Sequence, residues 1–163
     1  MKKSIAIFGC SLFQDIKYKD GRYHPTQMQT VIQLTNQYKI DNYSLEGMTT
    51  SRAKRLIASL PMKKLYENCI LSLGEAELDY PEAFEKNLIE IISMLQKKCV
   101  RPLLVSLPKE MMSNEKAVLI QDILDKVAVE KNVDYIYEGE TTKLVSYKVL
   151  ENQGFTDAIL NLC

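Results

Sequence analysis

Histidine is almost missing from this sequence: His24 is the only one among 163 residues. Any mechanism that needs a pair of histidines, or a histidine late in the chain, is therefore excluded. Cysteine is sparse too, and Cys10, Cys69, Cys99 and Cys163 form no CxxC pair that would indicate a zinc site. The first three lie in or beside apolar runs, as free thiols do in reducing compartments, so we expect a cytoplasmic protein with no metal and no cofactor.

A surplus of charge is also lacking, since 21 Lys and Arg balance 21 Asp and Glu. Nucleic acids and anionic membranes are bound through surplus cations, so the composition argues against nucleic acid as the main partner. No apolar run is long enough for a membrane span, and Ile5–Phe8 is too short for a signal peptide. No glycine-rich phosphate loop follows a strand, which makes nucleotide binding a minor option.

What the sequence does contain is ordinary for a globular protein, with 46% hydrophobic and 26% charged residues. Its length suits one domain with a substantial core, so we expect a single domain over residues 1–163.

Short apolar runs alternate along the chain with amphipathic segments. The runs predict strands at 4–8, 39–45, 69–73, 101–107 and 134–137, and the segments predict helices at 26–38, 49–60, 83–97, 114–131 and 152–162. The polar stretch 14–25 is interpreted as a loop. This alternation predicts an α/β fold, a three-layer αβα sandwich with a five-stranded, mainly parallel sheet. Such sheets bind ligands outside the carboxyl ends of their strands.

The first predicted strand ends in Gly9, Cys10 and Ser11. A serine here suits a nucleophile, because it lies at the sheet edge among backbone N–H groups that can stabilise an oxyanion. A serine after a first strand is more often a turn or capping residue.

The next two strand ends carry a glycine each. Gly47 permits a positive φ or a close backbone approach, and its amide could point into the crevice. Gly74 precedes Glu75, Glu77 and Asp79, which could do acid–base work or hold a hard cation. The commoner interpretation is structural, since carboxylates are favoured at the start of the helix that follows.

Together these positions resemble the conserved blocks of the SGNH, or GDSL-type, hydrolases. Gly9-Cys10-Ser11-Leu12 stands where that family has Gly-Asp-Ser-Leu, and Gly47 closes an N-x-x-x-x-G pattern that begins at Asn42. Where the family has Gly-x-Asn-Asp, this chain has Gly74, Glu75, Ala76 and Glu77. Asn152–Phe155 is similar to the segment after the family's catalytic histidine, so the resemblance spans the chain and implies a flavodoxin-like topology.

The resemblance implies that Ser11 is the nucleophile, with its own amide and that of Gly47 as oxyanion donors and Gly74 beside the third donor position. The family's late Asp-x-x-His falls at about Ser146 and Val149, neither of which can act, and Ala76 has no side-chain amide. A serine without a base is a poor nucleophile. The resemblance thus implies a degenerate active site: a non-catalytic or very slow protein that binds a small ester, an acylated carbohydrate or a protein partner.

Two alternatives stay open. In the first, the chain is an active acyl-ester hydrolase or acyltransferase, acting on a carbohydrate or lipid ester, in which Ser11 works with an unorthodox base such as His24. Cys10 could serve as a thiol nucleophile, although a buried structural thiol is the commoner role. In the second, the chain is a flavodoxin-like or nucleotide-binding domain in which Ser11 and Thr49 contact phosphate.

Overall fold

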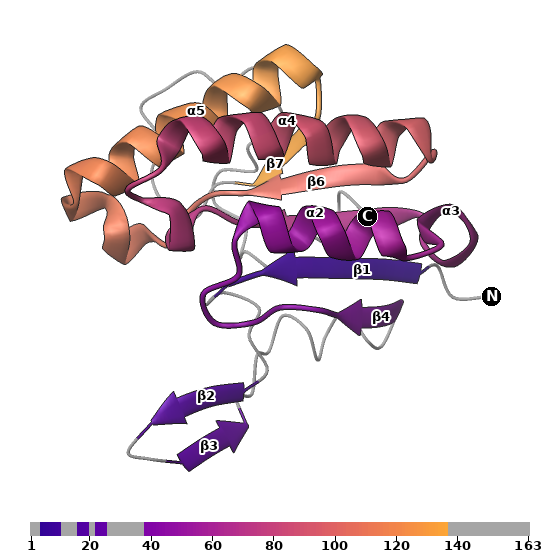
Figure 1. Cartoon of the computed structure of the whole chain (residues 1–163), viewed down its shortest axis with the longest axis horizontal. Helices are drawn as coiled ribbons and strands as arrows, with labels where there is room; N and C mark the ends of the chain where they lie inside the picture. The colour runs from indigo at the N-terminus through magenta and orange to yellow at the C-terminus, as the bar shows by residue number, and fades with distance from the viewer. Residues whose placement is uncertain (1–3, 11–15, 20–21, 26–37, 137–163) are drawn as a thin grey trace.

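The computed structural model of the chain describes residues 4–10, 16–19, 22–25 and 38–136. Their main element is a parallel sheet of five strands in the order β4-β1-β5-β6-β7 (Figure 1). The strands are β1 Ser4–Gly9, β4 Lys39–Asn42, β5 Asn68–Ser72, β6 Arg101–Val105 and β7 Asp134–Ile136. From β1 the chain adds β4 on one side and then returns to add β5, β6 and β7 on the other side. The order of the strands therefore switches between β1 and β5, and doubly wound sheets bind ligands at such a switch point.

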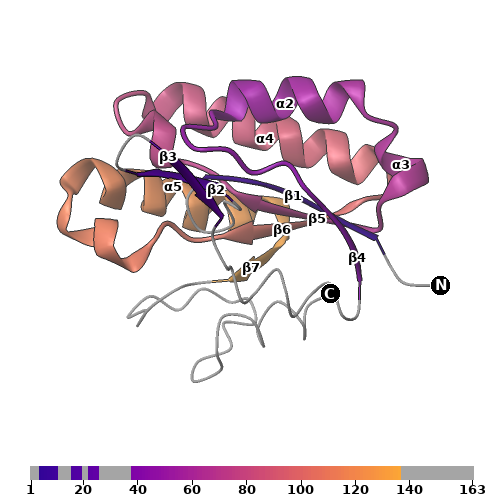
Figure 2. The same cartoon turned by 90° about the horizontal axis from the view of Figure 1, so that it is seen from below.

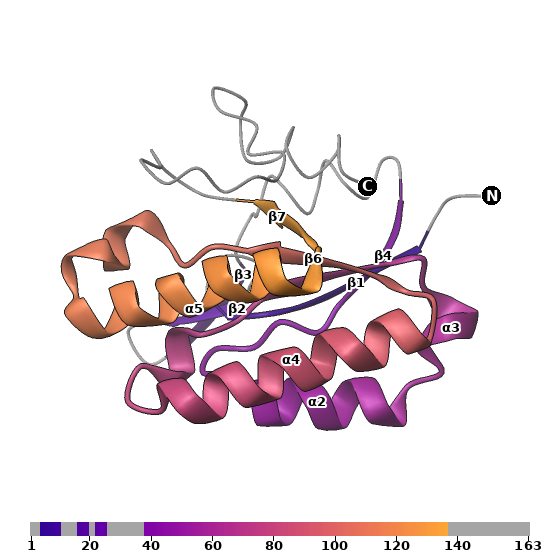
Figure 3. The same ribbon diagram turned by 90° about the horizontal axis from the view of Figure 1, so that it is seen from above.

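The described helices are α2 Thr50–Ser59, α3 Met62–Leu65, α4 Pro81–Lys97 and α5 Glu115–Lys131, with 3-10 turns η2 Glu75–Glu77 and η3 Lys109–Ser113. Figures 2 and 3 show α2 and α4 side by side on one face of the sheet. Helix α4 begins at Pro81, whose fixed φ suits a first helical position. Helix α5 begins after Asn114, whose side chain caps it, and ends at Asn132 in the left-handed conformation.

The core lies between these helices and the sheet. Phe8, Leu71 and Leu104 project into it from the strands and are fully buried. Facing them are apolar side chains of the helices: Ala53, Ile57, Phe84, Leu88, Ile92, Ile120 and Leu124. Ile5, Ile7 and Ile70 are buried as well, so the central strands are covered on both faces, as parallel strands usually are. Each large side chain buried in this way contributes about 1.5–3 kcal/mol.

The predicted α/β fold is confirmed, and each of the five predicted strands is present. The strands predicted at 39–45 and 101–107 end earlier than expected, at Asn42 and Val105. The helices predicted at 49–60, 83–97 and 114–131 are present within one or two residues of their predicted bounds. The helix predicted at 152–162, and the one at 26–38 except for its last residue, lie outside the described residues.

The interpretation of 14–25 as a loop was wrong. Strands β2 Ile16–Lys19 and β3 Arg22–Pro25 form an antiparallel hairpin, separate from the main sheet in Figure 1. The neglected signal is the Asp-Gly pair at 20–21 between two β-prone runs, a strong local preference for a hairpin.

Within the ranges that the structure describes, no helix is long and apolar enough to cross a membrane.

Candidate functional site

The candidate site begins where β1 and β5 end side by side. The backbone N–H of Cys10 donates to the carbonyl of Ser72 at 3.1 Å, so the chain stays against β5 after β1 ends. A Cβ on Gly9 would lie 3.0 Å from the Ser72 Cβ and 3.1 Å from its carbonyl oxygen, so any larger residue would push β5 away by a few tenths of an ångström and glycine is favoured. Ser11, the predicted nucleophile, follows directly but lies outside the described residues.

Cys10 is a buried thiol that joins two loops. Its Sγ donates to the carbonyl of Met48 at 3.2 Å, and the backbone N–H of Ala76 bonds to the sulfur. Burial, together with the negative charges of Glu75 and Glu77, raises the pKa of the Cys10 thiol to about 12, although hydrogen bonds from the backbone lower it in part. The thiol is therefore uncharged at neutral pH and unsuited to act as a nucleophile.

The loop after β4 continues alongside the end of β1. The N–H of Leu45 donates to the carbonyl of Gly9 at 3.0 Å, and the N–H of Met48 closes a turn onto the carbonyl of Leu45 at 3.2 Å. Gly47 in this turn has φ +71°, and no atom lies within 4 Å of the position that a Cβ would take. Of the two options that Gly47 permits, a positive φ or a close backbone approach, the structure shows the positive φ, in an anchored turn with open space beside it.

Gly74 also has a positive φ, +122°, but its surroundings are full. A Cβ there would lie 2.8 Å from Cγ2 of Ile120 and 3.3 Å from side-chain atoms of both Leu107 and Phe84. This glycine is therefore required by the packing of β5 against α4 and α5, whatever else it does.

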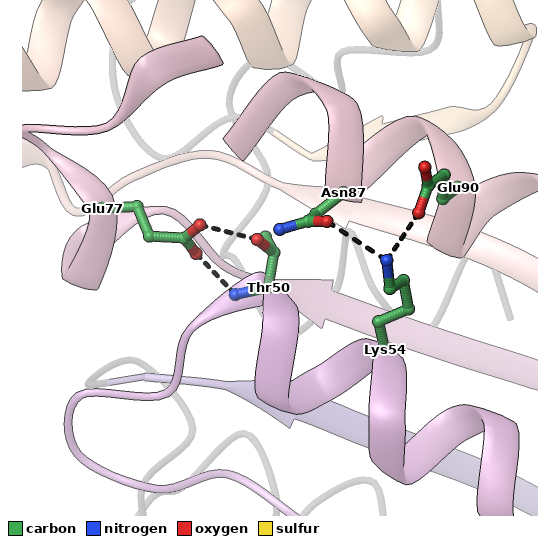
Figure 4. A network of polar contacts seen from close by, with 5 residues as sticks. All are labelled: Thr50, Lys54, Glu77, Asn87 and Glu90. Atoms are coloured by element: carbon green, nitrogen blue, oxygen red, sulfur yellow. Dashed lines mark hydrogen bonds and ion pairs between the residues drawn. The ribbon is translucent and has the colours of Figure 1, made fainter. Parts of the chain in front are cut away.

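Glu77 is only 5% exposed, and its carboxylate binds the first turn of α2. It accepts hydrogen bonds from the backbone N–H of Thr50 at 2.5 Å and from the Thr50 hydroxyl at 2.6 Å (Figure 4). The sequence interpretation placed this carboxylate at the start of the helix that follows it. The structure places it at the start of α2, which precedes it in the chain and packs against α4.

The three acidic residues after β5 do not all converge on one point, although Glu75 and Glu77 both lie near Cys10. Asp79 pairs with Lys116 of α5, whereas Glu77 binds Thr50. In the part of the chain that is described, no group of three or more His, Cys, Asp or Glu side chains could hold a metal ion.

Helix α2 is also held to α4. The Nζ of Lys54 lies 2.6 Å from a carboxylate oxygen of Glu90 and 3.3 Å from the amide oxygen of Asn87 (Figure 4). Both charged side chains are partly exposed, so this pair adds little to stability and mainly fixes the orientation of the helix.

Thr49 caps α2, because its side chain accepts a hydrogen bond from the backbone N–H of Arg52 at 3.2 Å. Between them, Thr49 and Glu77 occupy backbone donors that a phosphate would need at this helix terminus.

Of the predicted site residues, Gly47 and Gly74 lie in the loops that follow β4 and β5, the two strands that flank β1. His24 lies on β3, opposite Lys17 in the hairpin register, rather than in the predicted loop. Ser146, Val149 and 152–155 lie outside the described residues. The contacts of Cys10 and Glu77 were not anticipated, because Thr50 and Glu77 are 27 positions apart and no local pattern reports such a contact.

The strand order, with loops that meet after β1, β4 and β5, is the flavodoxin-like order of a doubly wound sheet, and the fold is that of solved SGNH, or GDSL-type, hydrolases. Neither a family model nor a curated protein matches the sequence. Among solved structures, the chain is similar to AlinE4, an SGNH-hydrolase family esterase, with 23% identity and a TM-score of 0.59 over 83% of this chain and 75% of that one.

Two further esterases illustrate the likeness. The psychrotrophic esterase EstA from Pseudoalteromonas sp. has 14% identity and a TM-score of 0.68 over 98% of this chain and 96% of its own. A mutant of Axe2, an acetyl-xylooligosaccharide esterase from Geobacillus, has 11% identity and a TM-score of 0.65 over 83% of this chain and 75% of its own. At these identities the likeness shows a shared fold.

Proposed function

We propose that this chain is an SGNH-fold protein with a degenerate active site, which binds a ligand or protein partner in its crevice and hydrolyses esters very slowly or not at all. The proposal rests on the bonding and the protonation of two side chains near the end of β1, Glu77 and Cys10. The Glu77 carboxylate is used by Thr50, and the Cys10 thiol is buried with a raised pKa. Neither group is available to activate a serine that follows Cys10.

The resemblance to the family supports the same conclusion, because this chain lacks the family's residues at three catalytic positions. Ala76 offers no side-chain amide to an oxyanion, and Ser146 and Val149 offer neither an orienting carboxylate nor a base. Losing a base and an oxyanion donor together costs several orders of magnitude in rate.

The charges near the crevice favour an uncharged ligand. Glu75 and Glu77 both lie close enough to Cys10 to raise its pKa, and Glu77 already occupies the positive end of α2. A phosphate or carboxylate would meet these negative charges, which also weighs against the nucleotide-binding alternative. An acylated carbohydrate or another small neutral ester fits better, and the Axe2 esterase of similar fold acts on an acetylated oligosaccharide.

We place the protein in the cytoplasm as part of this proposal. The cysteines that the structure describes, Cys10, Cys69 and Cys99, are all free thiols, as expected in a reducing compartment.

The competing function is an active acyl-ester hydrolase in which Ser11 works with His24. The esterases of similar fold favour it, as does the position of His24 in the segment between Ser11 and β4. This alternative makes a different prediction for the reactivity of Ser11.

The experiment is reaction of the purified protein with a fluorophosphonate probe, read by intact mass. We expect no stoichiometric labelling of the wild-type protein, under conditions that fully label an active SGNH esterase. Ser11→Ala and His24→Ala are measured beside it, with Ser51→Ala, at an exposed position of α2, as the matched control. Stoichiometric labelling that is lost in Ser11→Ala contradicts the degenerate site, and its additional loss in His24→Ala identifies the base.

A further inference from the structure

One side chain, Cys10, contacts both turns that flank the end of β1. Its Sγ donates to the carbonyl of Met48 in the turn that carries Gly47, and the N–H of Ala76 in η2 bonds to the same sulfur. Its own backbone N–H bonds to Ser72 of β5. Cys10 therefore joins the end of β1 to two segments that are distant in sequence, the Gly47 turn and residues 72–76.

Glu77 makes a second connection between the same two regions. It lies in η2, next to Ala76, and binds the backbone and hydroxyl of Thr50, two residues after Met48. Cys10 and Glu77 thus connect η2 to the segment Met48–Thr50 at two neighbouring points (Figure 4 shows the second).

We propose that Cys10 is a positioning residue of the crevice, and that with Glu77 it sets the separation between the Gly47 turn and the turn that begins at Gly74. This inference rests on the proposed function in one respect only, namely that these turns line the ligand site. This positioning role explains why the chain has a cysteine where the SGNH hydrolases have aspartate. A neutral thiol can donate to the Met48 carbonyl and tolerate two nearby carboxylates.

An aspartate at position 10 would be unfavourable in these surroundings. It would add a third negative charge beside Glu75 and Glu77 in a buried place, and its ionised form could not donate to Met48. Restoring the family residue in this chain therefore harms the crevice.

The first test is amide hydrogen exchange, measured residue by residue by NMR in Cys10→Ala. We expect exchange at Met48, Ala76 and Glu77 to become at least about tenfold faster than at reference amides in β5, since Cys10→Ala removes the tie between the two turns. Cys69→Ala is the matched control: Cys69 is equally buried, but burial alone accounts for its raised pKa. Cys69→Ala should lower the free energy of unfolding without a selective increase in exchange at Met48, Ala76 and Glu77.

Cys10→Ser is the conservative variant, since a hydroxyl can donate and accept where the thiol does. We expect it to restore most of the protection that Cys10→Ala loses at Met48 and Ala76. A purely space-filling role for the thiol would give the reverse order, with alanine equal to or better than serine.

The second test is the pH dependence of Cys10→Asp. The folded protein raises the pKa of this carboxyl above its unfolded value, so stability is greater at low pH and is lost as the pH rises through the folded pKa. We expect its unfolding midpoint to fall further below that of wild type between about pH 5 and about pH 8, whereas the deficit of Cys10→Ala stays constant.

Uniform exchange changes in Cys10→Ala, or a Cys10→Asp protein as stable as wild type at about pH 8, overturn the inference. Neither test needs turnover or a ligand. Labelling of Ser11 by a fluorophosphonate would overturn the degenerate site and leave this inference standing, so the two failures are distinguishable.

Discussion

Replacing Gly74 with alanine tests the geometry after β5 directly. At φ +122° a residue other than glycine is strained by about 1–2 kcal/mol. The new Cβ would also lie 2.8 Å from Ile120 Cγ2 and 3.3 Å from Leu107 and Phe84, and overpacking of this kind costs about 1–3 kcal/mol. We therefore expect Gly74→Ala to lose about 2–5 kcal/mol of unfolding free energy, a large part of the 5–15 kcal/mol typical of a domain.

The assay is urea unfolding followed by far-UV circular dichroism, with Gly47→Ala as the matched control. Gly47 has φ +71° but no atom within 4 Å of the added Cβ, so Gly47→Ala carries only the strain of about 1–2 kcal/mol. The midpoint should shift further for Gly74→Ala than for Gly47→Ala, with unchanged slopes. Equal losses, or a smaller loss for Gly74→Ala, would refute the packing around Gly74.

Two further predictions compare a buried side chain with an exposed one of the same type. In the native protein the exposed Cys99 should react with maleimide at neutral pH, whereas Cys10 should not, because burial raises the pKa of its thiol to about 12. Peptide mapping by mass spectrometry reports the labelling of each cysteine. Rapid labelling of Cys10 would contradict its burial. Gln121→Met should cost about 1–3 kcal/mol, because it leaves the buried N–H of Leu107 without its acceptor at 3.0 Å. Gln96→Met, at an exposed position, should change the unfolding midpoint little, and an equal effect of both substitutions would contradict the role of Gln121.

Helix α4 shows what could be predicted from local pattern. The residues Phe84, Leu88, Ile91, Ile92 and Leu95, chosen for their helical spacing, are all fully buried in the structure. The spacing suffices because all of them lie on one helix, where a period of 3.6 residues places them on the same face.

The hairpin shows where the interpretation failed although a local signal existed. Its short strands are rich in lysine, arginine and tyrosine, so the hydrophobic pattern that predicted the other strands is weak there. The hairpin pairs with itself and not with the main sheet, and turn chemistry was the better guide.

The sequence by itself determined the alternation of strands and helices and placed at position 47 a glycine that permits a positive φ; the position of the site at the strand ends stays a prediction. The tertiary structure alone decided which partners these positions have. Glu77 binds Thr50 of the preceding helix, and Gly74 faces Ile120, because crossover connections bring distant segments to one sheet edge. Periodicity reports neighbours within one element, so contacts between elements appear only once the chain is folded.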